Sequence, residues 1–166
     1  TLSYLALENF IGIALVEEYC KMKAAKKVAW RHPAFNYHFD AIVYCVTSAL
    51  GFAAIENVFY CVEEGFGLVV SRALLSVPSH AVDGLIMGYY FGLAKEAELA
   101  GDRRRRKRFM RFSVLMPMLT HGFYDFALLL DADWILLLFF VFVIALDIWA
   151  YRFVKKQARE DRTLAA

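Results

Sequence analysis

Hydrophobic residues gather in five stretches along the chain, and charged residues gather in the segments between them. Each stretch is close to the roughly 20 residues that a helix needs to cross the ~30 Å hydrocarbon layer of a bilayer. The stretches cover residues 2–29, 37–62, 66–94, 109–130 and 134–151. This pattern predicts an all-α, polytopic membrane helix bundle of about five transmembrane helices. We expect one domain over residues 1–166, ending in a cytoplasmic tail over residues 152–166.

The connecting segments alternate in charge. KMKAAKKVAWR, GDRRRRKR and RFVKKQAR follow the first, third and fifth stretches, whereas the acidic segments EEG and DAD follow the second and fourth. Under the positive-inside rule this places the basic segments in the cytoplasm and the start of the chain outside. The first stretch begins next to Thr1 without the basic start of a signal peptide, so we expect further residues before it.

Composition agrees with a membrane protein. The chain is 60% hydrophobic and has a mean hydropathy of +0.46, above the 45–50% apolar content of soluble domains. We therefore expect the lipid bilayer as its surroundings. The arginine run at 103–106 lies in a predicted cytoplasmic segment, where it is interpreted as a topology anchor touching anionic lipid, with no nucleic-acid partner. Gly84, Gly88 and Gly92 recur every four residues, which predicts close packing of the third helix.

Ionisable residues lie inside four of the five stretches, where they are costly and mark functional candidates. They are Glu17, Glu18 and Lys21, then Glu56, then His80 and Asp83, then His121 and Asp125. Several are spaced three or four residues apart, which puts them on one helix face where they can pair. A carboxylate one turn from a histidine orients the imidazole, as a base or a metal ligand requires.

The depth of each ionisable group in the membrane indicates whether these groups can meet. At 1.5 Å per residue, Glu56, His121 and His80 lie roughly 9, 14 and 21 Å from the acidic loops. If the first helix continues to Trp30, Glu17 also lies near the middle of the membrane. We therefore predict one buried polar cluster in the outer to middle part of the bundle.

Four ordered segments resemble the signature segments of the PrsW family of bacterial intramembrane proteases, which are related more distantly to the CAAX prenyl protease and Abi families. The segments are EEYCK (Glu17, Glu18, Lys21), GFAAIEN (Glu56, Asn57), SHAVDGLIMG (His80, Asp83) and HGFYD (His121, Asp125). The resemblance implies a multi-pass protease of the bacterial cytoplasmic (inner) membrane. It also implies single-pass membrane substrates of the anti-sigma-factor kind, cut on the outer side.

Two mechanisms fit these residues. In the first, which needs no cofactor, the Glu17–Glu18 pair supplies the base that activates water, with Glu17 preferred because a buried carboxylate is a stronger base than an exposed one. His80 or His121 completes the acid–base pair, Asn57 donates to the oxyanion and Lys21 keeps one carboxylate ionised.

In the second mechanism, one zinc ion is held by Glu56, His80 and His121, and Glu17 remains the base. Asp83 and Asp125 then orient the two imidazoles. The helical HExxH pair of many zinc proteases is absent from the sequence. The two mechanisms stay open at this stage.

Two other classes of protein use intramembrane carboxylates or histidines. A haem-binding electron carrier could use His80 and His121 as axial ligands, but it would have no use for the three glutamates. A proton-coupled transporter would need such groups too, although five helices without inverted repeats are few for alternating access.

Overall fold

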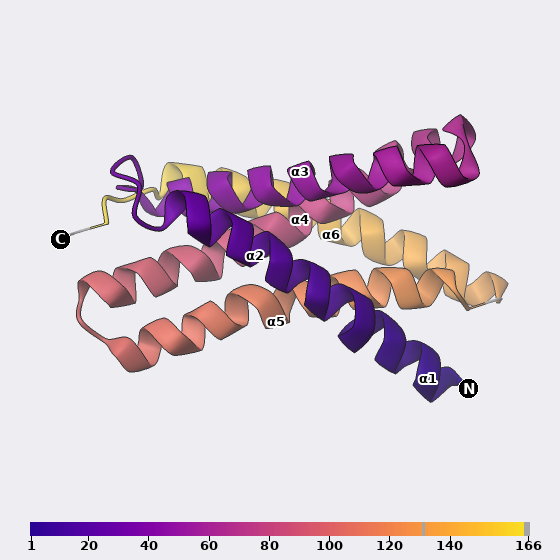
Figure 1. Cartoon of the computed structure of the whole chain (residues 1–166), viewed down its shortest axis with the longest axis horizontal. Helices are drawn as coiled ribbons and strands as arrows, with labels where there is room; N and C mark the ends of the chain where they lie inside the picture. Colours follow the sequence, from indigo (N-terminus) through magenta and orange to yellow (C-terminus); the bar gives the residue numbers. More distant parts are fainter. Residues whose placement is uncertain (131, 165–166) are drawn as a thin grey trace.

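The computed structural model describes residues 1–130 and 132–164 and contains five uninterrupted helical segments, with no β-strand among those residues (Figure 1). The first segment joins α1 (Leu2–Leu7), the π-helix η1 (Glu8–Ala14) and α2 (Leu15–Ala29). The others are α3 (His38–Glu64), α4 (Phe66–Leu99), α5 (Arg103–Leu128) and α6 (Asp133–Arg159). The predicted all-α helix bundle is confirmed. Asp131 of the predicted DAD loop and the last two residues of the predicted tail lie outside the described residues.

Three helices extend well beyond their predicted apolar stretches. α4 continues to Leu99, α5 begins at Arg103 and α6 continues to Arg159, because lysine, glutamate and arginine are good helix formers even though they are polar. Much of the predicted tail is therefore helical. The chain then folds back on the start of α3, where the Leu164 amide donates to the Asn36 carbonyl at 2.8 Å.

The turns define two ends of the bundle. The basic end contains the α2–α3 loop, the α4–α5 turn and the C-terminal end of α6, and the acidic end contains the α3–α4 and α5–α6 turns. Gly65 and Gly101 turn the chain with φ of 86° and 73°, a region that suits glycine. Asp102 then caps α5 by accepting from the Arg105 amide at 2.8 Å. The first residues of the chain lie at the acidic end, and the last described residues, up to Leu164, lie at the basic end (Figure 1).

The surface carries large apolar side chains, as a lipid-facing surface should. Val62 is 81% exposed and Leu137 66% exposed. By length and composition alone, α3 and α6 could cross a membrane, with mean hydropathies of 1.6 and 2.4. The first helix, α4 and α5 are less apolar, and they carry most of the buried ionisable residues. The three more polar helices thus supply most of the interior chemistry.

The glycine stripe sits where α4 meets α3. A Cβ at Gly84 would lie 2.7 Å from the Val46 Cα, and one at Gly88 would lie 2.5 Å from the Ile42 Cα. Real side chains cannot occupy such positions, so glycine allows the two backbones to approach. Close backbone approach is a main source of helix association in a bilayer, where lipid removes the usual hydrophobic driving force.

Candidate functional site

The first helix brings three of the predicted site residues to the centre of the bundle. Glu18 and Lys21 are 0% and 1% exposed. The Lys21 ammonium donates to Glu18 Oε1 at 2.6 Å and lies 3.5 Å from Glu17 Oε2. The expected Glu17–Lys21 pair is present, but Glu18 makes the shorter contact. Because a buried charge needs a partner, this ammonium balances both carboxylates.

His80 on α4 connects the first helix to α3. Its Nδ1 lies 2.9 Å from Lys21 Nζ, and its Nε2 lies 2.9 Å from Glu56 Oε2. An ammonium group can only donate, so Nδ1 accepts and Nε2 carries the proton that is donated to Glu56. These partners assign a neutral imidazole with a defined tautomer.

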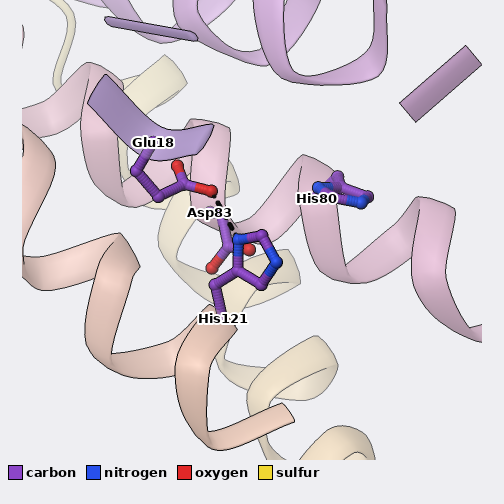
Figure 2. Close-up of side chains that lie close together, drawn as sticks. All are labelled: Glu18, His80, Asp83 and His121. Atoms are coloured by element: carbon purple, nitrogen blue, oxygen red, sulfur yellow. Dashed lines mark hydrogen bonds and ion pairs between the residues drawn. The ribbon is translucent and has the colours of Figure 1, made fainter. Parts of the chain in front are cut away.

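His121 on α5 has a different environment. Its Nδ1 lies 2.8 Å from Glu18 Oε1, and its Nε2 lies 3.2 Å from Asp125 Oδ2 and 3.7 Å from Glu17 Oε2. Ionised carboxylates only accept hydrogen bonds, so both contacts are satisfied together by a doubly protonated imidazole. The expected His121–Asp125 pair is present. Figure 2 shows the bond between Glu18 and His121.

Asp83 does not orient His80 as its spacing predicted. Its Oδ1 accepts from the Thr120 hydroxyl of α5, and both His80 nitrogens already contact Lys21 and Glu56. Asp83 is nevertheless buried beside Glu18 and His121 (Figure 2). Its hydrogen bond with Thr120 therefore links α4 to α5.

Arg72 on α4 is a site residue that our sequence reasoning missed. Its Nε donates to Asn57 Oδ1 at 2.9 Å and its Nη2 to Glu56 Oε2 at 3.2 Å, while the guanidinium lies 4.0 Å from the centre of the Tyr60 ring. The signal was available, because an arginine inside an apolar stretch is a functional candidate in its own right. Asn57 contacts Arg72 through Oδ1, and the hydrogen bonds of the described residues include none from its amide NH₂.

A proline precedes each histidine inside its helix. Pro78 lies two residues before His80 in α4, and Pro117 lies four residues before His121 in α5. A proline in a helix interior removes one amide donor and clashes with the carbonyl four residues earlier. Each helix is uninterrupted at its proline, and the missing amide donor falls within four residues of a histidine.

A cavity of about 510 Å³ opens beside this network, toward the acidic end. Side chains from the first helix, α3, α4 and α5 line it. The ionisable lining residues are Glu17, Glu56, Arg72, His80, His121 and Asp125. The apolar lining includes Ile13, Leu68, Leu75 and Leu128. Glu18, Lys21 and Asp83 do not line the cavity, so the network has a face toward the cavity and a face toward the core.

Two groups of side chains have donor atoms within 4.8 Å of one another, as a metal ion requires. One is Glu18, His80, Asp83 and His121, and the other is Glu17, Glu56 and His80. The set expected from the sequence, Glu56, His80 and His121, is divided between them. Carboxylate and imidazole donors suit zinc. Glu17 Oε2 and Glu18 Oε2 are also buried without a hydrogen-bond partner, so the residues fit a metal.

Cations lie beside both groups, and the groups differ in access. Lys21 Nζ lies 2.9 Å from His80, which both groups share, and Arg72 Nη2 lies 3.2 Å from Glu56 of the second group. All three residues of the second group line the cavity, where water can reach them. The second group is therefore the better metal site.

Comparison with known proteins gives a consistent result. The model of the family described as PrsW family intramembrane metalloprotease matches residues 1–149. The protein named Protease PrsW of Geobacillus kaustophilus is 39% identical over 129 residues, which cover 78% of this chain and 55% of that protein. Protease PrsW of Halalkalibacterium halodurans is 37% identical over 156 residues, covering 94% of this chain and 70% of that protein.

Protease PrsW of Bacillus subtilis is 37% identical over 137 residues, covering 81% of this chain and 61% of that protein. No solved structure matches the chain. Against the Geobacillus protein, the chain spans about half of the relative's length. The family model nevertheless covers all the residues of the site, from Glu17 to Asp125. The family resemblance is confirmed: this chain belongs to the PrsW family of intramembrane metalloproteases.

Proposed function

We propose that this chain hydrolyses peptide bonds of single-pass membrane proteins of the anti-sigma-factor kind, on the outer side of a bacterial cytoplasmic membrane. One observation carries the proposal: Glu17, His80 and His121, from three different helices, line a single cavity. The two histidines are joined by hydrogen bonds through Lys21 and Glu18, and Glu17 Oε2 lies 3.7 Å from His121. The cavity lies toward the acidic end, which the positive-inside rule assigns to the outer side. Its apolar walls suit the side chains of a membrane-spanning substrate.

Glu17 is the base in this proposal. Both Glu17 and Glu18 are near His121, but only Glu17 lines the cavity. Its Oε2 has no hydrogen-bond partner and can accept a proton from a water molecule as that water attacks the peptide carbonyl. Glu18, which already accepts from Lys21 and faces His121, acts by holding those two groups in place.

The two histidines have different roles because their partners differ. His121 lies between Glu18 and Asp125, so it holds two ring protons and can give one to the leaving amine. His80, fixed by Lys21 and Glu56, positions Glu56 at the cavity wall.

The oxyanion donor is better assigned to Arg72 than to Asn57. Arg72 lines the cavity, whereas Asn57 does not line it and orients the guanidinium from behind. Donors placed in advance where negative charge develops contribute strongly to catalysis of acyl transfer.

The family description includes a metal, and Glu17, Glu56 and His80 are the residues that would hold it. Glu17 would then be a ligand of the metal in place of its role as the base. Zinc bound there would supply Lewis-acid activation of water and of the peptide carbonyl. Whether or not a metal is bound, His121 remains the proton donor and Arg72 the donor to the oxyanion.

A haem site is disfavoured by the contact between the two imidazoles. Their ring centroids lie 5.3 Å apart at an interplanar angle of 83°. This edge-to-face contact leaves no room for a planar macrocycle between the rings.

The test is cleavage of a tagged single-pass substrate by the protein reconstituted in lipid vesicles. Glu17→Gln and His121→Ala should each abolish the product, and Glu63→Gln, an exposed glutamate on α3, should leave it unchanged. Elemental analysis of the same preparations should show about one zinc per chain if the metal version holds, lost in Glu56→Gln and His80→Ala. Cleavage by Glu17→Gln at the native rate would refute the assignment. Proton flux that depends on Glu56, without any cleavage, would replace proteolysis by transport.

A further inference from the structure

A second cavity, of about 520 Å³, lies between α2 and α5 at the basic end and shares no lining residue with the active-site cavity. Four cations and five other residues line it. The cations are Lys26, Arg106, Lys107 and Arg111, and the others are Tyr19, Met22, Met110, Val114 and Leu115. The lining therefore joins a cationic mouth to walls that are almost entirely apolar.

The order of these residues along the helices gives the groove a direction. On α2, Lys26 lies toward the basic end and Tyr19 lies deeper, and on α5 Lys107 lies toward the basic end and Leu115 lies deeper. At 1.5 Å per residue, each wall runs roughly 10–12 Å into the bundle. The groove thus begins at the level expected for lipid headgroups and continues to the level of the acyl chains.

The charges at the mouth are mostly uncompensated. Arg106 pairs with Glu98 at 2.8 Å. No carboxylate in residues 1–130 and 132–164 forms an ion pair with Lys26, Lys107 or Arg111. Lys23, Lys27 and Arg31 line an adjoining cavity together with Lys26 and Arg106 and add to the same positive field. An anion at this position would relieve repulsion among several cations.

We propose that this groove binds one anionic phospholipid, with its phosphate between Lys26, Lys107 and Arg111 and the start of one acyl chain between α2 and α5. An anion attached to a hydrocarbon chain matches both parts of the lining, which free phosphate or an acidic peptide does not. Basic pockets between membrane helices on the cytoplasmic side are typical headgroup sites. This binding does not depend on the proposed proteolysis.

Native mass spectrometry of the detergent-solubilised protein, titrated with phosphatidylglycerol or with phosphatidylcholine of the same acyl chains, measures the binding directly. We expect one phosphatidylglycerol to be retained at concentrations at least tenfold lower than phosphatidylcholine. Each cation near a lipid surface contributes about fivefold, so the double variant Lys107→Gln/Arg111→Gln should bind about 25-fold more weakly. The matched control, Lys155→Gln/Lys156→Gln at the end of α6, should stay within twofold of the wild type.

A second variant separates a built site from general attraction to positive charge. Leu115 is 39% exposed, so Leu115→Trp can fill the groove without entering the core or removing a cation. It should abolish retention of phosphatidylglycerol, and glycerol 3-phosphate should not displace the lipid from the wild type. The proposal is overturned if the two double variants bind equally, if Leu115→Trp binds as the wild type does, or if glycerol 3-phosphate competes.

Discussion

Replacement of Lys21 by methionine tests whether the ammonium group holds the buried network together. Methionine keeps most of the volume of the side chain and removes its charge and its hydrogen-bond donors. The change leaves Glu18, which is 0% exposed, without its 2.6 Å partner and His80 Nδ1 without its 2.9 Å donor. Removing one partner of a buried ion pair costs about 3–5 kcal/mol, because the remaining charge is left in a poorly solvating interior.

The measurement is the free energy of unfolding in mixed micelles, followed by circular dichroism. Lys21→Met should lower it by about 3 kcal/mol or more. Lys27→Met, an exposed lysine on the same helix, is the control and should change it by less than about 0.5 kcal/mol. The double variant Glu18→Gln/Lys21→Met removes both charges, so it should recover about 2 kcal/mol relative to Lys21→Met alone. A loss below about 1 kcal/mol for Lys21→Met, or strictly additive effects in the double variant, would refute the reasoning.

Three further predictions concern other parts of the molecule. Arg72→Lys should reduce the cleavage rate about 10–100-fold with unchanged helicity, because lysine cannot reach both partners on α3; a native rate would exclude Arg72 from the site. Gly88→Ala should lower the free energy of unfolding by about 1–3 kcal/mol because its Cβ meets the α3 backbone, whereas Gly51→Ala, which faces open space, should not lower it. Burial raises the pKa of Glu98, but the hydrogen bond from Arg106 and the positive charge of Lys95 together outweigh burial and hold the pKa below its ordinary value of 4.5. A carboxyl group whose pKa is lower in the folded protein than in the unfolded chain stabilises the fold above about pH 4.5. The free energy of unfolding should therefore fall as the pH drops below about 4.5, and Arg106→Gln should reduce this fall.

The helices of this protein could be predicted well because each corresponds to an apolar stretch of membrane length. The polar ends of the helices could not be predicted from this pattern, because α4 and α6 extend through residues such as Lys95 and Lys155, which favour helix without being apolar. The π-helix at residues 8–14 also has no hydrophobic pattern of its own. It carries Asn9, which is 2% exposed and lines the active-site cavity.

Pairs within one helix were easier to predict than pairs between helices. Helical spacing predicted the contact of His121 with Asp125, which the structure contains. The same rule predicted a contact of His80 with Asp83, which is absent from the described hydrogen bonds, because His80 instead bridges Lys21 and Glu56. Spacing along one helix shows which residues can meet, but the rotation of neighbouring helices decides which of them do.

The adjacent glutamates of the first helix show how one short motif can serve two environments. Successive residues of an α-helix are rotated by about 100°, so Glu17 and Glu18 leave the helix in different directions, although both carboxylates reach Lys21 and His121. Glu17 faces the cavity, and Glu18 faces the core, where it contacts Lys21 on its own helix and His121 on α5. Glu18 accepts both hydrogen bonds at Oε1, but it does not line the cavity, so its unpartnered Oε2 lies in the core and is not available to water in the cavity. Two carboxylates next to one another in sequence separate the tasks: Glu18 holds the charged groups of the core in register, and Glu17 remains available at the cavity wall.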